Sequence, residues 1–282
     1  MRFAAGVPNV LEYGDPELLV DLARRAEAAG WDGFFVWDHL VYQEPGDPVA
    51  DPWTVVSAIA GCTSRIRLGV LVLALARRRP WKVARETATL DVLSGGRLVV
   101  GVGLGSLGPQ EFEAFGEDPD ARVRADRLDE GLEILAGLWS GEPFGYEGRY
   151  YRMRETVFRP TPLQRPLPVW VAARWPNRRP FRRAARWDGV FATHDDVGWT
   201  GTMTTDQLRE IVEYTRAHRT DPGRPFDVVM EGITPPAGAQ AADVVAPYGE
   251  VGLTWWVEKL GWFRGSVAEM RERVDAGPPS SA

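Results

Sequence analysis

The sequence predicts a closed (β/α)8 barrel, and three observations support this fold class. Short apolar runs alternate with longer stretches of helical periodicity along the chain. Eight such pairs can be counted, and strands that alternate with helices indicate parallel strands joined by right-handed crossovers. The chain has 282 residues, a length at which eight units fit a closed barrel better than an open doubly wound sheet.

Apolar runs and helix caps identify the elements of the first half of the chain. Aspartate followed by proline opens a helix, because the carboxylate caps free N–H groups and proline fits the first turn. Such pairs stand at Asp15-Pro16 and Asp51-Pro52, and Pro80 opens a third helix. The run 65–75 is apolar along its whole length, which is typical of a strand buried on both faces. In order, the expected elements are a strand at 2–7, a helix at 16–29, a strand at 33–37, a helix at 52–64, a strand at 65–75, a helix at 80–93, a strand at 97–103 and a helix at 120–139.

Residues 141–167 interrupt this rhythm. They are aromatic, basic and rich in proline, without a helical period, and we interpret them as a hairpin-like excursion. We therefore expect one barrel domain over 1–276, followed by a flexible tail at 277–282. After the excursion we expect strands at 168–172, 188–193, 226–234 and 252–258, followed respectively by helices at 178–187, 205–219, 238–247 and 266–275.

The composition excludes several classes of function. The chain has 33 Lys+Arg against 39 Asp+Glu and no basic stripe, which argues against nucleic-acid binding. The single cysteine, Cys62, cannot form an internal disulfide, and the three histidines are not spaced to hold zinc. The N-terminus lacks a signal arrangement, and no apolar run approaches the ~18 residues needed to span a bilayer. We expect a cytoplasmic protein that acts on a small molecule and has no metal, nucleic-acid partner or membrane segment.

The carboxyl ends of the strands carry the candidate catalytic residues, because functional groups in such barrels lie on the loops after the strands. Asp38 and His39 follow the second strand. A histidine exchanges protons near neutral pH, and a neighbouring carboxylate would fix its tautomer. His194, at the end of the sixth strand, is the candidate for a second proton donor. The alternative is that Asp38 caps the loop and His39 only packs at the rim.

A glycine-rich segment follows the fourth strand, where residues 103–108 match the pattern GxGxxG. A dinucleotide site would require a helix beginning inside this motif and an acidic residue on the next strand. A polar loop with Pro109 and Pro119 follows instead, so we reject that interpretation. Glycines at the rim would still let a flat or bulky ligand approach the backbone closely.

A cluster of arginines follows the fifth strand in a chain that is acidic overall. A helix beginning near Asn177 would offer free N–H groups to an anion. The cluster is therefore either a site for phosphate or another acidic group, or a solvated helix face. Its members are Arg174, Arg178, Arg179, Arg182 and Arg183.

Two carboxylates, Glu231 and Glu258, end the adjacent seventh and eighth strands. A barrel glycoside hydrolase would need such a pair on either side of the bond that it cleaves. Only scattered tryptophans support sugar chemistry, so this remains a rival interpretation.

Longer stretches of the sequence carry a more specific pattern, of which LDVLSGGRLVVGVG is the most distinctive part. The stretches are 26–40, 64–105, 111–118, 124–135 and 166–191. Together they resemble the bacterial luciferase-like superfamily of flavin- and deazaflavin-dependent oxidoreductases. The resemblance implies a (β/α)8 barrel with an excursion between strands four and five, and a homodimer.

The resemblance also implies a cofactor and the residues that bind it. The ring of coenzyme F420, or alternatively of FMN, would lie across the barrel mouth, and a hydride would pass between it and a small organic substrate. A non-proline cis peptide would fall at Leu71–Val72, behind the ring. The implied cofactor-binding residues are Asp38, Leu71, Val72, Gly103, Gly105, Ser106, Ala173, Arg174, Trp175, Asn177 and Arg178.

Two departures from the family pattern leave alternatives open. Ser106 stands where some deazaflavin enzymes carry a proton-donating glutamate, so the proton donor is not fixed by the resemblance. Asp38-His39 does not match the Glu-His-His type motif of the flavin monooxygenase branch, which favours the deazaflavin. The alternatives are an FMN-dependent monooxygenase that uses oxygen, a glycoside hydrolase and a non-catalytic ligand binder.

Overall fold

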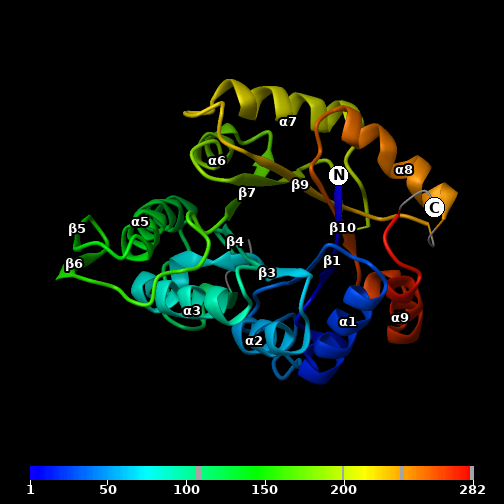
Figure 1. The fold of residues 1–282 in the computed structure, drawn as a ribbon, viewed down its shortest axis with the longest axis horizontal. Helices are drawn as coiled ribbons and strands as arrows, with labels where there is room; N and C mark the ends of the chain where they lie inside the picture. Colours follow the sequence, from blue (N-terminus) through cyan, green and yellow to red (C-terminus); the bar gives the residue numbers. More distant parts are fainter. Residues whose placement is uncertain (106–109, 199, 236–237, 280–282) are drawn as a thin grey trace.

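A computed structural model confirms the closed barrel with helices around it (Figure 1). The structure describes residues 1–105, 110–198, 200–235 and 238–279. Neighbouring barrel strands pair in parallel, and the order around the barrel is β1-β10-β9-β8-β7-β4-β3-β2. The barrel strands are β1 (Arg2–Val7), β2 (Gly33–Val36), β3 (Arg67–Ala74), β4 (Leu98–Gly103), β7 (Val169–Trp175), β8 (Gly189–His194), β9 (Asp227–Gly232) and β10 (Trp255–Lys259).

The helices that the sequence predicts begin within one residue of their expected starts, whereas α4 lies in the segment interpreted as a polar loop. Asp15 accepts a hydrogen bond from the N–H of Glu17, and Asp51 accepts one from the N–H of Thr54. In the described part of the chain, no helix is both long enough and apolar enough to cross a membrane. The helices are α1 (Pro16–Ala28), α2 (Pro52–Cys62), α3 (Pro80–Leu93), α4 (Gln110–Glu113), α5 (Ala121–Trp139), α6 (Arg178–Ala184), α7 (Thr205–Ala217), α8 (Ala239–Glu250) and α9 (Val267–Asp275), with the 3-10 turns η1 (Leu11–Gly14), η2 (Leu75–Arg77) and η3 (Trp262–Arg264).

The excursion between the fourth and fifth barrel strands is present as an antiparallel hairpin of β5 (Phe144–Glu147) and β6 (Arg152–Thr156). In Figure 1 this hairpin projects beside α5, away from the barrel. The hydroxyl of Tyr146 donates to Glu133 of α5 at 2.9 Å, which ties the hairpin to that helix.

The end of the chain corrects one expectation. Gly277 and Pro279 are buried, and Arg273 donates to the carbonyl oxygen of Gly277 at 2.7 Å. Residues 277–279 therefore belong to the packed structure and not to the flexible tail expected at 277–282, whose last three residues lie outside the described ranges.

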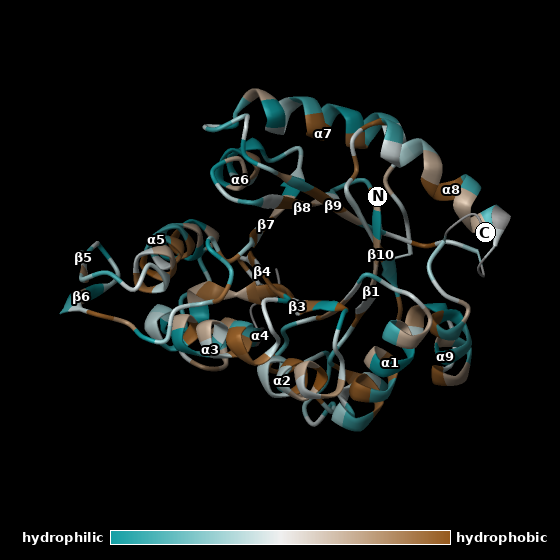
Figure 2. Cartoon of the chain, viewed as in Figure 1, coloured by the Kyte–Doolittle hydropathy of each residue, from teal (hydrophilic) through white to brown (hydrophobic). Residues whose placement is uncertain are grey.

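Aromatic side chains fill the inside of the barrel. The rings of Phe35 and Trp170 lie 5.3 Å apart, as do those of Trp170 and Trp255, and these residues are almost completely buried. Figure 2 shows that the surrounding helices carry both hydrophobic and hydrophilic residues, as expected for helices with one face on the barrel. We call Phe35, Trp170 and Trp255 the aromatic plug. Only inward side chains nearer the carboxyl ends of the strands remain for a site.

We predict that Gly69→Ala destabilises the barrel. A Cβ at Gly69 would lie 2.1 Å from the backbone oxygen of Val99 on the neighbouring strand, and overpacking of this kind costs about 1–3 kcal/mol. The matched control is Gly61→Ala in α2, where a Cβ meets nothing within 4 Å. Urea unfolding should show a lower midpoint for the first variant and an unchanged or higher one for the control. Equal midpoints would contradict the packing argument.

Candidate active site

Small side chains line one side of the barrel mouth. In the layer next to the aromatic plug, β3, β4 and β7 contribute Val72, Gly103 and Ala172. A Cβ at Gly103 would meet Cγ2 of Val72 at 2.7 Å and Cβ of Ala172 at 3.2 Å, so the three residues adjoin one another. The peptide bond between Leu71 and Val72 is cis, as the resemblance implied. We call Val72, Gly103 and Ala172 the small-residue floor, and its low side chains suit a planar group lying across the three strands.

The glycine-rich segment leaves β4 close to its neighbours. Gly105 has a φ of +83°, in the left-handed region that favours glycine. A Cβ there would lie 2.8 Å from Cβ of Ala74 and 3.1 Å from Cζ of Phe112. Ser106 lies outside the described residues, so its contact with a cofactor stays a prediction.

Asp38 is buried and does not orient His39, which corrects the expectation from their adjacency. Its Oδ1 lies 3.0 Å from Arg77 and 2.7 Å from Arg78, and its Oδ2 accepts from the N–H of Ala74 at 2.9 Å. Burial acts to raise the pKa of Asp38, but the two guanidinium groups outweigh it and lower the pKa below its usual value. The ionised Asp38 therefore holds the end of β3 against the end of β2.

His39 has a different carboxylate partner, Glu111 of the short helix α4. Nδ1 of His39 lies 3.1 Å from Oε1 of Glu111, which also accepts from the N–H of Leu40 at 2.7 Å. The other oxygen of Glu111 accepts from Arg77 at 3.2 Å. Arg77 thus bridges Asp38 and Glu111, and we call Asp38, Arg77, Glu111 and His39 the buried charge network.

The environment of Glu111 keeps it ionised. Burial acts to raise its pKa, but the hydrogen bond and charge of His39, the charge of Arg77 and the N–H of Leu40 lower the pKa below its usual value. An ionised carboxylate accepts a proton-bearing Nδ1, which leaves Nε2 of His39 to exchange a proton with a ligand. No described residue is a hydrogen-bond partner of that Nε2. Glu111 is therefore the residue that orients His39.

Aromatic rings form a wall beside His39. Its imidazole lies 5.9 Å from the ring of Trp37 and 5.2 Å from that of Tyr42, both at steep angles. Trp262 of η3 closes the group, at 6.0 Å from Trp37 and 5.5 Å from Tyr42. These edge-to-face contacts restrict the imidazole and give the mouth an apolar side.

Glu111 and Arg77 were not among the site residues expected from the sequence. Glu111 lies 72 positions from His39, in a segment interpreted as a polar loop. The signal that could have indicated them is the balance of buried charge. A buried Asp38 requires a cation such as Arg77 or Arg78, and two largely buried arginines require a second carboxylate such as Glu111.

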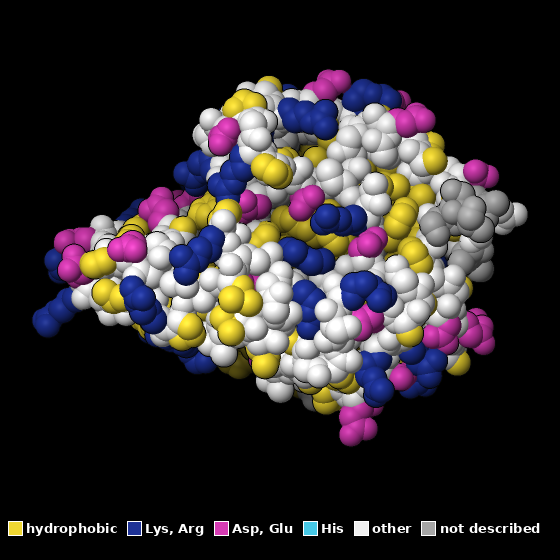
Figure 3. Space-filling view, viewed as in Figure 1, with side chains coloured by type: hydrophobic (Ala, Val, Ile, Leu, Met, Phe, Trp, Pro, Cys, Tyr) yellow, Lys and Arg dark blue, Asp and Glu magenta, His cyan; other side chains and the backbone are white. Residues whose placement is uncertain are grey.

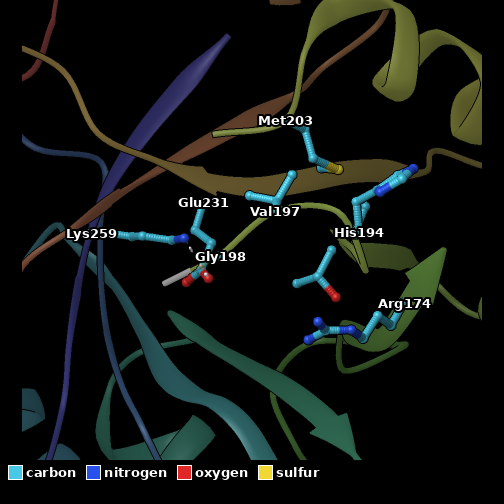
Figure 4. Close-up of a pocket in the computed structure, with 9 residues that line it drawn as sticks. Arg174, His194, Val197, Gly198, Met203, Glu231 and Lys259 are labelled. Atoms are coloured by element: carbon cyan, nitrogen blue, oxygen red, sulfur yellow. Dashed lines mark ion pairs between the residues drawn. The ribbon is translucent and has the colours of Figure 1, made fainter. Parts of the chain in front are cut away.

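A pocket of about 190 Å³ opens on the other side of the mouth, at the ends of β7 to β10. Figure 4 shows the Arg174 guanidinium and the Glu231 carboxylate pointing into this opening, with Lys259 reaching Glu231. Figure 3 shows hydrophobic side chains at the centre of this face, bordered by Lys or Arg and by Asp or Glu. We call it the Glu231 pocket; it is lined by Arg174, Ala192, Thr193, His194, Val197, Gly198, Met203, Glu231 and Lys259.

His194 lines this pocket, and Nδ1 of its ring is already engaged in a hydrogen bond. Nδ1 of His194 accepts from the N–H of Asp196 at 3.1 Å, and the side chain is almost completely buried. In Figure 4 the ring points away from Glu231 and Lys259. The structure thus does not bring the two predicted proton-transfer histidines together, and the charge network lies with His39 alone.

The residues expected to hold a cofactor phosphate divide between two faces of β7. Arg174 points into the mouth and pairs with Asp195. Trp175 instead packs outward, with its ring 5.3 Å from Phe181 and 5.5 Å from Tyr214. Its side chain is therefore a packing residue, and contact of Trp175 with a cofactor phosphate stays a prediction. Like Trp175, Ala173 packs in the outer core, while Asn177 caps α6 and Arg178 stacks on Trp175.

The two glutamates proposed as a hydrolase pair face opposite sides of the barrel wall. Glu231 pairs in register with Val257, whose side chain lies inside the barrel. The next residue, Glu258, therefore points outward, where it is fully buried and lies 3.6 Å from Arg273 of α9. The carboxylates cannot flank one bond, so the structure contradicts this interpretation.

A model of the luciferase-like monooxygenase family matches residues 3–256. The chain belongs to this family. The match confirms the family expected from the sequence, and with it an oxidoreductase. One relative of this luciferase-like chain is named F420-dependent glucose-6-phosphate dehydrogenase, from Beutenbergia cavernae. It is 37% identical over 260 residues, which cover 90% of this chain and 74% of the relative.

Solved structures share the fold of this luciferase-like protein. An F420-dependent secondary alcohol dehydrogenase, solved with an F420-acetone adduct, has a TM-score of 0.78 at 16% identity and covers 99% of this chain and 98% of its own. The monooxygenase RslO1 from Streptomyces bottropensis has a TM-score of 0.75 at 23% identity and covers 98% of each chain.

We predict that Asp38→Asn destabilises this luciferase-like barrel by about 3–5 kcal/mol, because the guanidiniums of Arg77 and Arg78 lose their buried carboxylate. The control is Glu86→Gln, which breaks the exposed pair of Lys82 and Glu86 and should cost about 0.5 kcal/mol or less. Urea unfolding at neutral pH measures both. A small loss in the Asp38 variant would show that the buried pairs are not needed for folding.

The same carboxylates predict how stability depends on pH. The pKa values of Asp38 and Glu111 are lowered in the folded state, so their contribution is complete above the unfolded value of about 4 and is lost as pH falls through the folded values. The free energy of unfolding should therefore fall with acid in the wild type. The fall should be shallower in Asp38→Asn, measured by urea unfolding at a series of pH values, and an identical slope would contradict this.

Proposed function

We propose that this protein is an F420-dependent oxidoreductase that moves a hydride between the cofactor and a small organic substrate. The observation that carries the proposal is the His39–Glu111 pair, held by buried charges at the mouth that also presents the small-residue floor. Relatives named as F420-dependent enzymes, at 33–37% identity, support F420 as the cofactor.

The small-residue floor fits the ring of this cofactor. Val72, Gly103 and Ala172 leave no side chain tall enough to hold a planar group away from the strands. Arg174 stands at the end of β7 with its guanidinium pointing into the mouth, where it would face an acidic part of the cofactor. When bound, F420 supplies a ring carbon that accepts or donates a hydride.

The chain's own residues supply proton transfer and orientation. In the oxidising direction, Nε2 of His39 accepts the proton of an alcohol's hydroxyl oxygen. The carbon that bears this hydroxyl loses a hydride, and the carbonyl double bond forms. In the reducing direction, the protonated Nε2 returns that proton to the oxygen. Glu111 holds Nδ1 throughout and stabilises the charged imidazole. Trp37, Tyr42 and Trp262 give the substrate an apolar surface on this side.

FMN is the alternative cofactor, because a Baeyer-Villiger monooxygenase from Pseudomonas putida, solved in complex with FMN, shares this fold at a TM-score of 0.67. On this alternative the same floor would hold the ring of reduced FMN, and oxygen would be the second substrate. The family resemblance also supports two further parts of the proposal, a homodimer and a location in the cytoplasm. Sedimentation of the purified protein tests whether it forms a dimer.

We expect the purified protein to bind F420 with micromolar affinity and FMN more weakly, in titrations followed by visible absorbance. Gly103→Leu should weaken binding of either ring, since its side chain would rise from the floor. Gly61→Ala, at an exposed position of α2 where a Cβ meets nothing within 4 Å, is the control. Tighter binding of FMN would move the proposal to the monooxygenase, and binding of neither ring would refute it.

We further expect His39→Ala to lower kcat by about 10²–10⁴-fold with little change in affinity for F420, because only proton transfer is lost. Glu111→Gln should lower kcat by about 10–100-fold, since the imidazole keeps a partner but loses the charge, and Glu111→Asp should recover part of that loss. Stopped-flow reduction of F420 measures the rate. Unchanged turnover in His39→Ala would make its assignment wrong.

A further inference from the structure

The charged groups of the Glu231 pocket are already paired within the protein. Nζ of Lys259 lies 3.2 Å from Oε1 of Glu231 and 3.1 Å from the carbonyl oxygen of Gly201. The guanidinium of Arg174 is paired with the carboxylate of Asp195. Each cation that lines the pocket therefore has a carboxylate against it, and the two pairs together carry no net charge.

Within the inner pair, the anion is the more accessible partner. The Lys259 side chain is 7% exposed, whereas that of Glu231 is 23% exposed. A ligand that enters the pocket therefore reaches the carboxylate more readily than the ammonium. Like charges at hydrogen-bond distance repel, and the repulsion grows as the site excludes water. An anionic group would also have to break the pair to reach Lys259, which leaves Glu231 uncompensated.

The rest of the lining suits an uncharged molecule. Ala192, Val197 and Met203 provide apolar contact, and the hydroxyl of Thr193 provides a neutral polar group. A carboxylate accepts hydrogen bonds from hydroxyl groups. The opening of about 190 Å³ admits only a small molecule or one end of a larger one.

From this geometry we propose that the part of the substrate entering the Glu231 pocket is uncharged and carries a hydroxyl or carbonyl group, and that Glu231 excludes phosphate esters. This rests on the proposed function only in treating the ligand as the redox substrate; the exclusion of phosphate follows from the pocket itself. Glu231 is thus a specificity-determining residue, and relatives named for a phosphorylated sugar do not indicate this chain's substrate.

Isothermal titration with inorganic phosphate tests the exclusion without any cofactor. We expect the wild type to show no phosphate binding that depends on Lys259, so its titration should match that of Lys259→Met. Binding should be at least about ten-fold tighter to Glu231→Gln, where Lys259 has lost its counter-charge. Glu231→Asp keeps the charge and should still exclude phosphate. The matched control is Glu147→Gln, which breaks an exposed pair with Arg152 on the hairpin and should behave as the wild type.

Two results would overturn the proposal. One is saturable millimolar binding of phosphate to the wild type that is lost in Lys259→Met, which needs no folded Glu231 variant. The other is a Glu231→Gln protein with an unchanged melting temperature and no gain in phosphate binding. Absence of F420 binding would refute the proposed function and leave the phosphate result standing, so the two failures are distinguishable.

Discussion

The alternation of inward and outward side chains along closed strands is the constraint on which the site depends. Each barrel strand turns one face to the axis and the other to the helices. Phe35, Trp170 and Trp255 fill inward positions deeper in the barrel, so only inward residues near the carboxyl ends of the strands reach the mouth. On β9 and β10 these residues are Glu231 and Lys259, which therefore meet each other. Glu258, one position away, is turned into the helix layer and becomes part of the core.

The buried charge network joins three segments that are distant in sequence. Burying single charges costs several kcal/mol each, whereas a closed set of paired charges offsets much of that cost. Asp38 after β2, Arg77 in η2 and Glu111 in α4 each satisfy another member of the set. The position of the His39 ring is consequently fixed by protein groups. A histidine oriented before the ligand arrives loses less entropy in reaching the reactive geometry.

Much of the fold could be predicted from the sequence because its information is local and periodic. Apolar runs and Asp-Pro caps identified the barrel elements, and only the ends shifted by a few residues. The site was less predictable because its contacts are distant in sequence. Asp38 and His39 were expected to interact because they are adjacent in sequence. Their side chains point in different directions, and Asp38 pairs with Arg77 and Arg78 whereas His39 contacts Glu111. Glu111 was missed because no local pattern reports a contact across 72 positions.

The mouth divides into two halves that different forces control. On β3, β4 and β7 the small-residue floor works through the absence of side chains, so most substitutions there would block a planar group. On β9 and β10, the net charge of the Glu231–Lys259 pair determines which ligand charge the pocket accepts. One substitution in this pair would change that preference without touching the aromatic plug. Solved structures with this fold are named for reactions as different as alcohol dehydrogenation and monooxygenation at 16–23% identity. Such a barrel tolerates changes of function, because the residues at the mouth that select the ligand are separate from the core residues that stabilise the barrel.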